Sequence, residues 1–261
     1  MPLTFYRKPG LVVYVTCGDP DVATTREIVL TAIEAGADVI ELGVPFSDPV
    51  ADGPVIQRAS ERALKRGTSL AQVLTLAAEI RQHAQSTGLI VFSYLNPILR
   101  MGLEKFCKVA RAAGIDGALV TDLPVEEAQE YLRAMREYDL SPIFLAAPTS
   151  SDERLRRIAG ASRGFVYAVS RTGVTGQRQQ LAEDARKLVK RLRGVTKLPI
   201  ALGFGISTAE QFEEVGEFAD AVVVGSAIVE TIERNRGREA AAVGEFVRRL
   251  SAVSQLSATA R

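Results

Sequence analysis

Residues 37–57 have the sequence ADVIELGVPFSDPVADGPVIQ, in which an apolar run is followed by a loop rich in proline. The first part, ADVIEL, is β-branched and apolar enough to predict a buried strand, and the prolines indicate that the chain leaves this strand as a loop. Glu41 therefore lies at the C-terminal end of the predicted strand, with Asp48 and Asp52 in the loop that follows it. The sequence thus predicts a carboxylate held at a rigid strand end.

Glu41 is open to two interpretations. Burial of its charge would cost several kcal/mol unless the charge were paired or the pKa of the carboxyl were moved. Pairing with an arginine would make Glu41 structural, whereas a moved pKa is what general acid or base catalysis requires. We therefore interpret Glu41, together with Asp52, as a candidate catalytic residue. Asp48 belongs to a Ser-Asp-Pro sequence that is typical of turns, and we interpret it as a turn residue.

The same alternation of apolar strand and helix continues on both sides of this stretch. Apolar, β-branched runs predict strands at 11–16, 37–42, 89–94, 117–121, 142–146, 165–169, 198–202 and 219–224. Helical spacing of apolar residues predicts helices at 22–35, 55–66, 70–85, 103–113, 125–138, 152–160, 181–192, 208–215 and 239–250. The joints before three of the strands also resemble one another, with AGAD at 35–38, AGID at 113–116 and FAD at 218–220.

Eight apolar strands that alternate with helices indicate a parallel sheet buried on both faces, and eight such strands close into a barrel. We therefore predict the α/β class and a (β/α)8 TIM barrel of the phosphate-binding type. A length of 261 residues suits one such barrel, and no linker interrupts the pattern, so residues 1–261 are predicted to form a single domain. The tail at 251–261 is predicted to be frayed.

Charge and cysteine content exclude several classes of partner. The 32 basic and 31 acidic residues give a net charge of +1, which predicts neither nucleic-acid binding nor a polybasic membrane anchor. The chain has only two cysteines, Cys17 and Cys107, and they predict reduced thiols rather than a disulfide framework. Without an apolar run long enough to span a bilayer or the pattern of a signal peptide, the sequence predicts a cytoplasmic protein with no membrane association.

The loops after the last three predicted strands are rich in glycine. They have the sequences SRTGVTGQ at 170–177, GFGIS at 203–207 and GSA at 225–227. In a barrel of this class the active site lies at the C-terminal ends of the strands, and phosphate often binds after the last two. One such glycine is commonly just a tight turn, but three adjacent loops that lead toward helix N-termini favour a phosphate site. Gly173 and Gly176 would also allow the first of these loops to act as a lid.

The positions of the single histidine and of the lysines argue against several kinds of catalytic chemistry. His83 is the only histidine and falls in a predicted helix, which favours a surface position and argues against a histidine base or a histidine-rich metal site. Lys197 begins a predicted strand, and no lysine follows the C-terminal end of one, which argues against Schiff-base chemistry. We therefore expect carboxylates to transfer the protons and predict no metal.

Six motifs resemble the tryptophan synthase α subunit family, and they occur in the family's order between residues 11 and 233. They are VTCGDP at 15–20, ELGVPFSDPVADGPVIQ at 41–57, TDLPVEE at 121–127, SRTGVTG at 170–176, GFGIS at 203–207 and GSAIV at 225–229. The second motif is highly specific, whereas the glycine loops alone would fit several phosphate-binding barrels. The resemblance implies a lyase of tryptophan biosynthesis that cleaves indole-3-glycerol phosphate to indole and glyceraldehyde 3-phosphate by a retro-aldol reaction.

The resemblance also implies roles for individual residues. Glu41 would be the general acid and base, Asp52 would hydrogen-bond the indole N–H, and Tyr167 would lie beside the catalytic glutamate. Thr175 would be the lid residue that meets Asp52 on closure. The phosphate-binding positions would be Gly176, Gly205, Gly225 and Ser226. The walls of the indole pocket would be Tyr14, Ile56, Phe92, Tyr94, Leu119 and Phe204.

The resemblance further implies an α2β2 heterotetramer with a β subunit. Pyridoxal phosphate would belong to that subunit, and this chain would need no cofactor. The proline-rich loop and Asn96-Pro97 would lie toward the partner. Two features depart from the family: residues 1–10 are too short for the helix that usually covers the bottom of the barrel, and Leu95 replaces a common tyrosine.

Two other functions are compatible with the same barrel. An isomerase or epimerase of another sugar phosphate would place a different acid and base at other strand ends and would need no aromatic pocket. A barrel with weak catalysis could instead serve mainly as an allosteric partner of a β subunit. The retained carboxylates and lid glycines favour the lyase.

Overall fold

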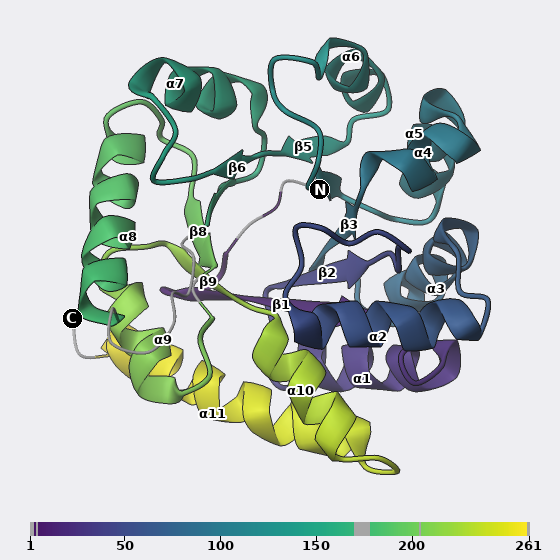
Figure 1. The fold of residues 1–261 in the computed structure, drawn as a ribbon. Helices are drawn as coiled ribbons and strands as arrows, with labels where there is room; N and C mark the ends of the chain where they lie inside the picture. Colours follow the sequence, from purple (N-terminus) through teal and green to yellow (C-terminus); the bar gives the residue numbers. More distant parts are fainter. Residues whose placement is uncertain (1–2, 4, 170–177, 204, 260–261) are drawn as a thin grey trace.

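The computed structural model describes residues 3, 5–169, 178–203 and 205–259, with the side chains of 178–182 and 255–259 left aside. Within these residues the strands are all parallel and follow the order β5-β4-β3-β2-β1-β9-β8-β7-β6 around a barrel (Figure 1). The strands are β1 Gly10–Thr16, β2 Val39–Gly43, β3 Gly88–Ser93, β4 Gly117–Val120, β5 Ser141–Ile143, β6 Leu145–Ala146, β7 Val166–Val169, β8 Ile200–Gly203 and β9 Ala221–Val224. The predicted (β/α)8 barrel is therefore confirmed.

Helices surround the barrel on its outer side (Figure 1). They are α1 Val22–Glu34, α2 Pro54–Lys65, α3 Leu70–His83, α4 Leu95–Met101, α5 Leu103–Ala112, α6 Gln129–Glu137, α7 Asp152–Ala161, α8 Arg178–Arg193, α9 Ala209–Gly216, α10 Ser226–Arg234 and α11 Glu239–Thr259. The sequence did not predict α4 or α10, which are short helices directly after β3 and β9. Helix α6 starts later than predicted, because turns with hydrogen bonds from Glu127 N to Pro124 O and from Ala128 N to Val125 O occupy the segment before it.

The fifth predicted strand, at 142–146, appears as two pieces on either side of Phe144. β5 pairs with β4, whereas β6 pairs with β7. β5 and β6 follow one another in the chain but pair with strands on opposite sides. Together they close the barrel between β4 and β7. The nine strands of the described chain therefore correspond to the eight that the sequence predicts.

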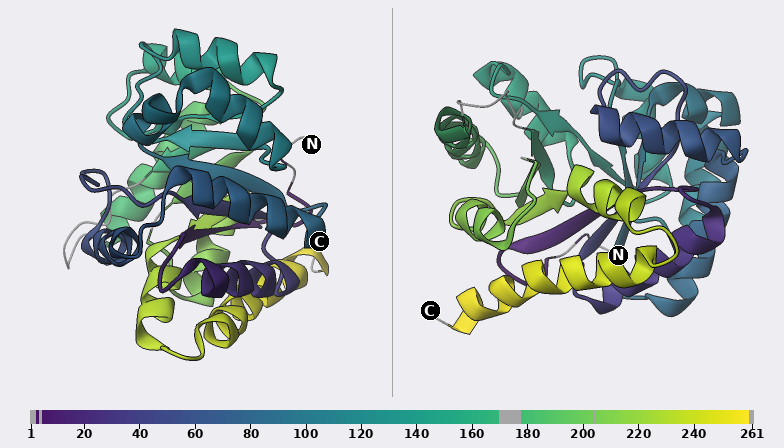
Figure 2. Two further views of the ribbon diagram at one scale, coloured as in Figure 1. Left: turned by 90° about the vertical axis from the view of Figure 1, so that its right-hand side faces the viewer. Right: turned by 60° about the horizontal axis from the view of Figure 1, so that its bottom comes forward.

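The C-terminal helix departs from the prediction. Helix α11 continues to Thr259, and it lies along α1 on the outside of the barrel (Figure 2). Ser251 and Ser254 are buried and donate hydrogen bonds of 2.7 Å to Ala35 O and Pro9 O respectively. The prediction that the chain frays from Ser251 is therefore wrong for these residues, because their hydroxyls bind backbone carbonyls of segments far away in the sequence.

The N-terminal segment packs against the barrel interior. Leu3 is buried and lies so close to Gly88 and Gly164 that a side chain at either glycine would collide with it. Phe5 packs on Phe165, with 5.6 Å between the ring centroids. Both apolar side chains join the cluster of buried residues that fills the barrel. Leu3 and residues 5–9 thus cover the N-terminal end of the strands, and no helix is formed within these described residues.

The similar joints before three strands share a structural role. Asp38, Asp116 and Asp220 each precede a strand and accept a hydrogen bond from a backbone N–H near the start of the neighbouring strand. The donors are Leu11 N at 2.8 Å, Leu89 N at 2.9 Å and Ile200 N at 2.8 Å. Because these N–H groups lie where the ladder begins, the carboxylates fix the register of each strand pair.

We expect Asp116→Ala to lower the free energy of unfolding by about 3 kcal/mol, because it leaves the buried Leu89 N–H without its acceptor and the guanidinium of Arg81 without its carboxylate partner. Arg81 Nη2 lies 2.7 Å from Asp116 Oδ2 in a largely buried pair. Urea denaturation measures the change, with the exposed Asp48→Ala as the control variant. A loss no larger than that of the control would show that this carboxylate does not stabilise the strand pair.

Candidate active site

Glu41 lies on β2, in register with Tyr14 of β1 and Ile90 of β3. Its side chain is only 1% exposed, and within the described chain its Oε1 atom is buried without a hydrogen-bond partner. Burial raises the pKa of Glu41 to about 8, because water no longer stabilises the charged form. The structure thus does not pair Glu41 with an arginine within the described residues, and it leaves a carboxyl that is protonated at neutral pH.

Asp52 lies in the loop between β2 and α2, and Tyr94 holds it there. The Tyr94 hydroxyl donates a hydrogen bond to Asp52 Oδ2 at 3.1 Å and accepts one from Ala51 N at 2.9 Å. Gln57 Nε2 donates to the Asp52 carbonyl at 2.9 Å. Burial raises the pKa of Asp52 to about 6, although the bond from Tyr94 opposes this rise. Asp52 is therefore largely ionised at neutral pH, in contrast to Glu41.

Tyr14 and Tyr167 are both buried near the two carboxyls. Burial, and secondly the charges of nearby carboxylates, raise the pKa of both phenols well above their usual value. Each ring occupies space that a glycine leaves free. A side chain at Gly43 would collide with the Tyr14 hydroxyl, and a Cβ at Gly203 would lie 2.9 Å from the Tyr167 hydroxyl. Sequence reasoning missed Gly43, although a glycine inside a strand signals close approach of another group.

An apolar surface lies beside these groups. Ile56 of α2 and Phe92 of β3 pack on a cluster that contains Tyr14, and the Tyr14 and Phe92 rings meet edge to face at 5.1 Å between centroids. Phe46 stacks on Tyr94 at 4.9 Å. Leu119 is fully buried within the barrel, in the same cluster as Tyr167. The predicted pocket residues Tyr14, Ile56, Phe92 and Tyr94 therefore gather near Asp52 and Glu41, whereas Leu119 forms part of the packed interior.

The predicted phosphate positions lie at two loop ends. Gly225 is the N-cap of α10 and Ser226 its first residue, so both lie at a helix N-terminus directly after the C-terminal end of β9. Gly205 has a φ of +65°, a conformation that favours glycine. Backbone N–H groups at a helix N-terminus suit an anion. Three predicted residues, Thr175, Gly176 and Phe204, lie outside the described residues.

The remaining candidates occupy the positions that the sequence indicated. Asp48 is exposed, and its backbone carbonyl accepts a turn hydrogen bond from Val50 N at 2.8 Å. His83 is exposed at the end of α3 and lies 3.1 Å from Arg26 Nη2. In the described part of the chain, no cluster of histidine, cysteine, aspartate and glutamate could hold a metal ion. No helix among the described residues is both long and apolar enough to cross a membrane.

The barrel and its site define a class of protein: a (β/α)8 barrel with two carboxyls of different pKa, next to a cluster of apolar side chains and a helix N-terminus. A family model described as "Tryptophan synthase alpha chain" matches residues 4–258. The chain belongs to the tryptophan synthase alpha chain family.

Relatives and solved structures agree with this family. A tryptophan synthase alpha chain of Solibacter usitatus is 53% identical over 228 residues, which cover 87% of this chain and 85% of the relative. One from Neisseria meningitidis serogroup B is 46% identical over 241 residues, or 92% of each chain. The crystal structure of tryptophan synthase from M. tuberculosis in its aminoacrylate- and BRD0059-bound form has a TM-score of 0.86 and 35% identity, covering 95% of this chain and 93% of that chain.

Proposed function

We propose that Glu41 and Asp52 together catalyse the reaction of this family, the retro-aldol cleavage of indole-3-glycerol phosphate to indole and glyceraldehyde 3-phosphate. The chain is a lyase of tryptophan biosynthesis. The observation that supports these roles best is the state of Glu41, whose buried Oε1 lacks a partner within the described residues and whose pKa is raised to about 8. Such a carboxyl holds a proton at neutral pH and is free to give it to a substrate.

Glu41 would act twice in one turnover. Its proton goes to C3 of the indole ring, which makes the ring an iminium-like electron sink. The resulting carboxylate then takes the proton from the glycerol hydroxyl next to the ring while the bond between C3 and that carbon breaks. The bonding electrons return to the ring, the hydroxyl becomes the aldehyde of glyceraldehyde 3-phosphate, and Glu41 ends protonated as it began. No water or cofactor is consumed in this sequence.

Asp52 would stabilise the charge that forms in between. Protonation at C3 places positive charge on the indole nitrogen, and an ionised carboxylate that accepts a hydrogen bond from the N–H stabilises it. The pKa of about 6 supports this role, because Asp52 is charged when Glu41 is not. Two carboxyls whose environments separate their pKa values are the arrangement expected for divided acid and base roles.

The rest of the site would bind the two ends of the substrate. Tyr14, Ile56, Phe92 and Tyr94 would contact the indole, together with Leu119 and Phe204, and Tyr167 would lie beside Glu41. Gly225 and Ser226 would bind the phosphate at the α10 N-terminus, together with Gly205 and Gly176. Thr175 would meet Asp52 when the lid closes.

The partner of this chain is the beta subunit of tryptophan synthase. We propose that the proline-rich loop and Asn96-Pro97 face it in an α2β2 assembly. Val50, in the loop, and Leu99, on α4, support this orientation, because both are apolar and yet 86% and 57% exposed. Pyridoxal phosphate would belong to the beta subunit and this chain would bind no cofactor. The free, buried thiols of Cys17 and Cys107 suit the cytoplasm.

The test is indole release from indole-3-glycerol phosphate by the purified chain, with and without a beta subunit. We expect measurable release by the chain alone and a faster rate when the beta subunit is added, because docking would act on the loop that holds Asp52. Serine turnover by the beta subunit is followed in the same mixtures. A folded chain that stimulates serine turnover yet releases no indole would instead identify an allosteric partner without catalysis.

A further inference from the structure

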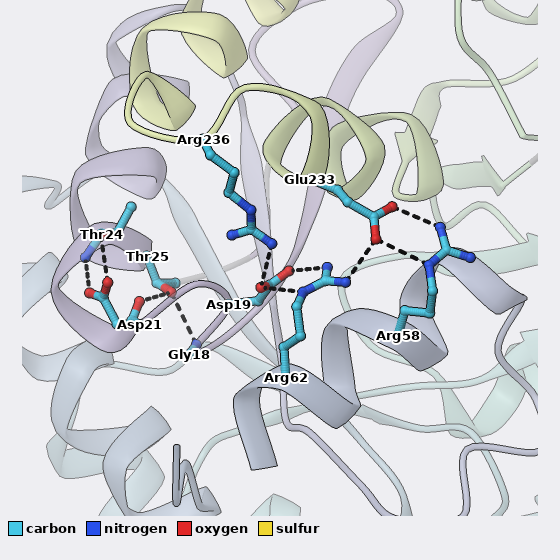
Figure 3. A network of polar contacts seen from close by, with 9 residues as sticks. All are labelled: Gly18, Asp19, Asp21, Thr24, Thr25, Arg58, Arg62, Glu233 and Arg236. Carbon is cyan, nitrogen blue, oxygen red and sulfur yellow. Dashed lines mark hydrogen bonds and ion pairs between the residues drawn. The ribbon is translucent and has the colours of Figure 1, made fainter. Parts of the chain in front are cut away.

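A group of ion pairs joins α2, α10 and the loop after β1, and we call it the Arg62 network (Figure 3). Its members are Asp19, Arg58, Arg62, Glu233 and Arg236. Arg58 and Arg62 are one helical turn apart on α2, Glu233 is on α10, and Asp19 belongs to the turn after β1. The network therefore links segments that are far apart in sequence.

Arg62 lies at the centre of this network. Its Nε and Nη2 atoms donate to the two oxygens of Asp19 at 2.9 and 2.7 Å, and its Nη1 donates to Glu233 Oε1 at 2.8 Å. The Asp19 side chain is only 1% exposed, so loss of these bonds would leave a buried carboxylate with only the longer contact of 3.5 Å to Arg236. Only the planar fork of an arginine can bind one carboxylate with two nitrogens and a second carboxylate with the third.

The two helices that Arg62 joins begin at opposite ends of the site. Helix α2 begins at Pro54, two residues after Asp52, and Gln57 of its first turn binds the Asp52 carbonyl. Helix α10 begins at Ser226, with Gly225 as its N-cap. The strands before these helices, β2 and β9, lie on either side of β1. The spacing of α2 and α10 therefore determines the spacing of Asp52 and the α10 N-terminus.

An apolar layer separates the network from the barrel interior. Ala59 of α2 and Val229 of α10 are fully buried and share a cluster with Tyr14 of β1. This layer is non-directional, so it favours contact between the helices without fixing how they slide or rotate. The directional bonds of Arg62 supply that restraint. Hydrogen bonds from Arg58 and Arg62 hold the pKa of Glu233 at about 2, so the carboxylate stays charged throughout an assay range.

We propose that Arg62 is a positioning residue that sets the distance between the indole end and the phosphate end of the substrate site, by fixing α2 to α10 through Glu233 and to the β1 loop through Asp19. This inference rests on the proposed function, because it assumes that Asp52 serves the indole and the α10 N-terminus the phosphate. It predicts that the affinity for a molecule that spans both ends of the site depends on Arg62, whereas the affinity for either half of that molecule alone does not.

The test compares three probes by calorimetry: indole, glycerol 3-phosphate, and indole-3-propanol phosphate, which carries both ends but lacks the reacting hydroxyl. In Arg62→Met and Glu233→Gln we expect the linked probe to bind about tenfold more weakly, because linkage helps only when both subsites are correctly spaced. The affinities for indole alone and for glycerol 3-phosphate alone should change by less than about twofold. Arg62→Lys, which keeps the charge but loses the fork, should resemble Arg62→Met.

Asp139→Asn is the matched control. Asp139 is also a carboxylate shared by two arginines, Arg111 and Arg163, but it precedes β5 at the N-terminal end of the barrel. The Asp139→Asn substitution should leave the affinities for all three probes unchanged. Equal weakening of the halves and the linked probe, or no weakening of any, would overturn the proposal. If Arg62→Met does not fold, Glu233→Gln and Arg62→Lys decide the question. Indole release by the wild-type chain is measured separately. If the wild type releases indole but the Arg62 variants bind the linked probe normally, the positioning role is excluded while the proposed function stands.

Discussion

Replacing Glu41 by glutamine is expected to reduce indole release by a factor of about 10² to 10⁴, the usual contribution of a positioned general acid and base. The amide keeps the size of the side chain but can neither give a proton to the indole ring nor take one from the glycerol hydroxyl. The loss should appear in kcat, with a small change in KM, because in the proposed mechanism the side chain acts on the reacting bond. Single-turnover indole release measures it directly.

The pH dependence of stability gives a second test of Glu41, which does not depend on activity. The pKa of Glu41 is about 8 in the folded protein and about 4.5 when solvated, so the folded state binds the proton more tightly. Wild-type stability should therefore fall as the pH rises from 4.5 to 8, by an amount on the order of 5 kcal/mol. Glu41→Gln removes this dependence, although its buried amide has a cost at every pH.

Denaturation at pH 5 and pH 8.5 tests this expectation. The free energy of unfolding of Glu41→Gln minus that of wild type should be greater at pH 8.5 than at pH 5, while indole release by the variant stays far below that of wild type at both pH values. A variant that keeps near-wild-type indole release would exclude Glu41 as the acid. A variant whose stability follows the wild type at both pH values would show that Glu41 is ionised in the folded protein.

Local sequence patterns predicted the strands and placed Glu41 on β2, because they depend only on residues close together in the chain; β2 continues to Gly43, so Glu41 lies in the middle of the strand rather than at its end. An apolar, β-branched run followed by prolines indicates a strand that ends in a loop. In a barrel, that alone places Glu41 at the catalytic face. The short helix α4 was not predicted, because it has only seven residues; Pro97 lies in its first turn, where a proline removes no intrahelical hydrogen bond.

Contacts between distant segments could not be predicted in the same way. The repeated aspartate before β2, β4 and β9 was visible in the sequence, but its acceptor role depends on which strand lies beside it. The partners of Arg62 come from turns and helices that are more than 40 residues away. Gly43 gives only a hint of close approach, and Tyr14 becomes its neighbour only when β1 pairs with β2.

Asp52→Asn is expected to lower kcat for indole release about 10²-fold, comparable to the loss of one preorganised group that stabilises transition-state charge. Asparagine still offers an oxygen to the indole N–H, so binding of indole itself should change little. The substitution removes the negative charge that, in the proposed mechanism, lies opposite the ring nitrogen when C3 is protonated. A loss confined to KM would contradict this role and make Asp52 a residue for binding alone.

The pH profile separates the two carboxyls. Wild-type kcat/KM should fall below about pH 6, as Asp52 gains a proton, and above about pH 8, as Glu41 loses its own. Asp52→Asn should abolish the acid limb of the remaining activity. Tyr94→Phe is the matched variant: the hydrogen bond from Tyr94 lowers the pKa of Asp52, so its removal should move the acid limb to higher pH and leave the basic limb in place. An acid limb that persists in Asp52→Asn would assign this limb to another group and would contradict the proposal that it reports the protonation of Asp52.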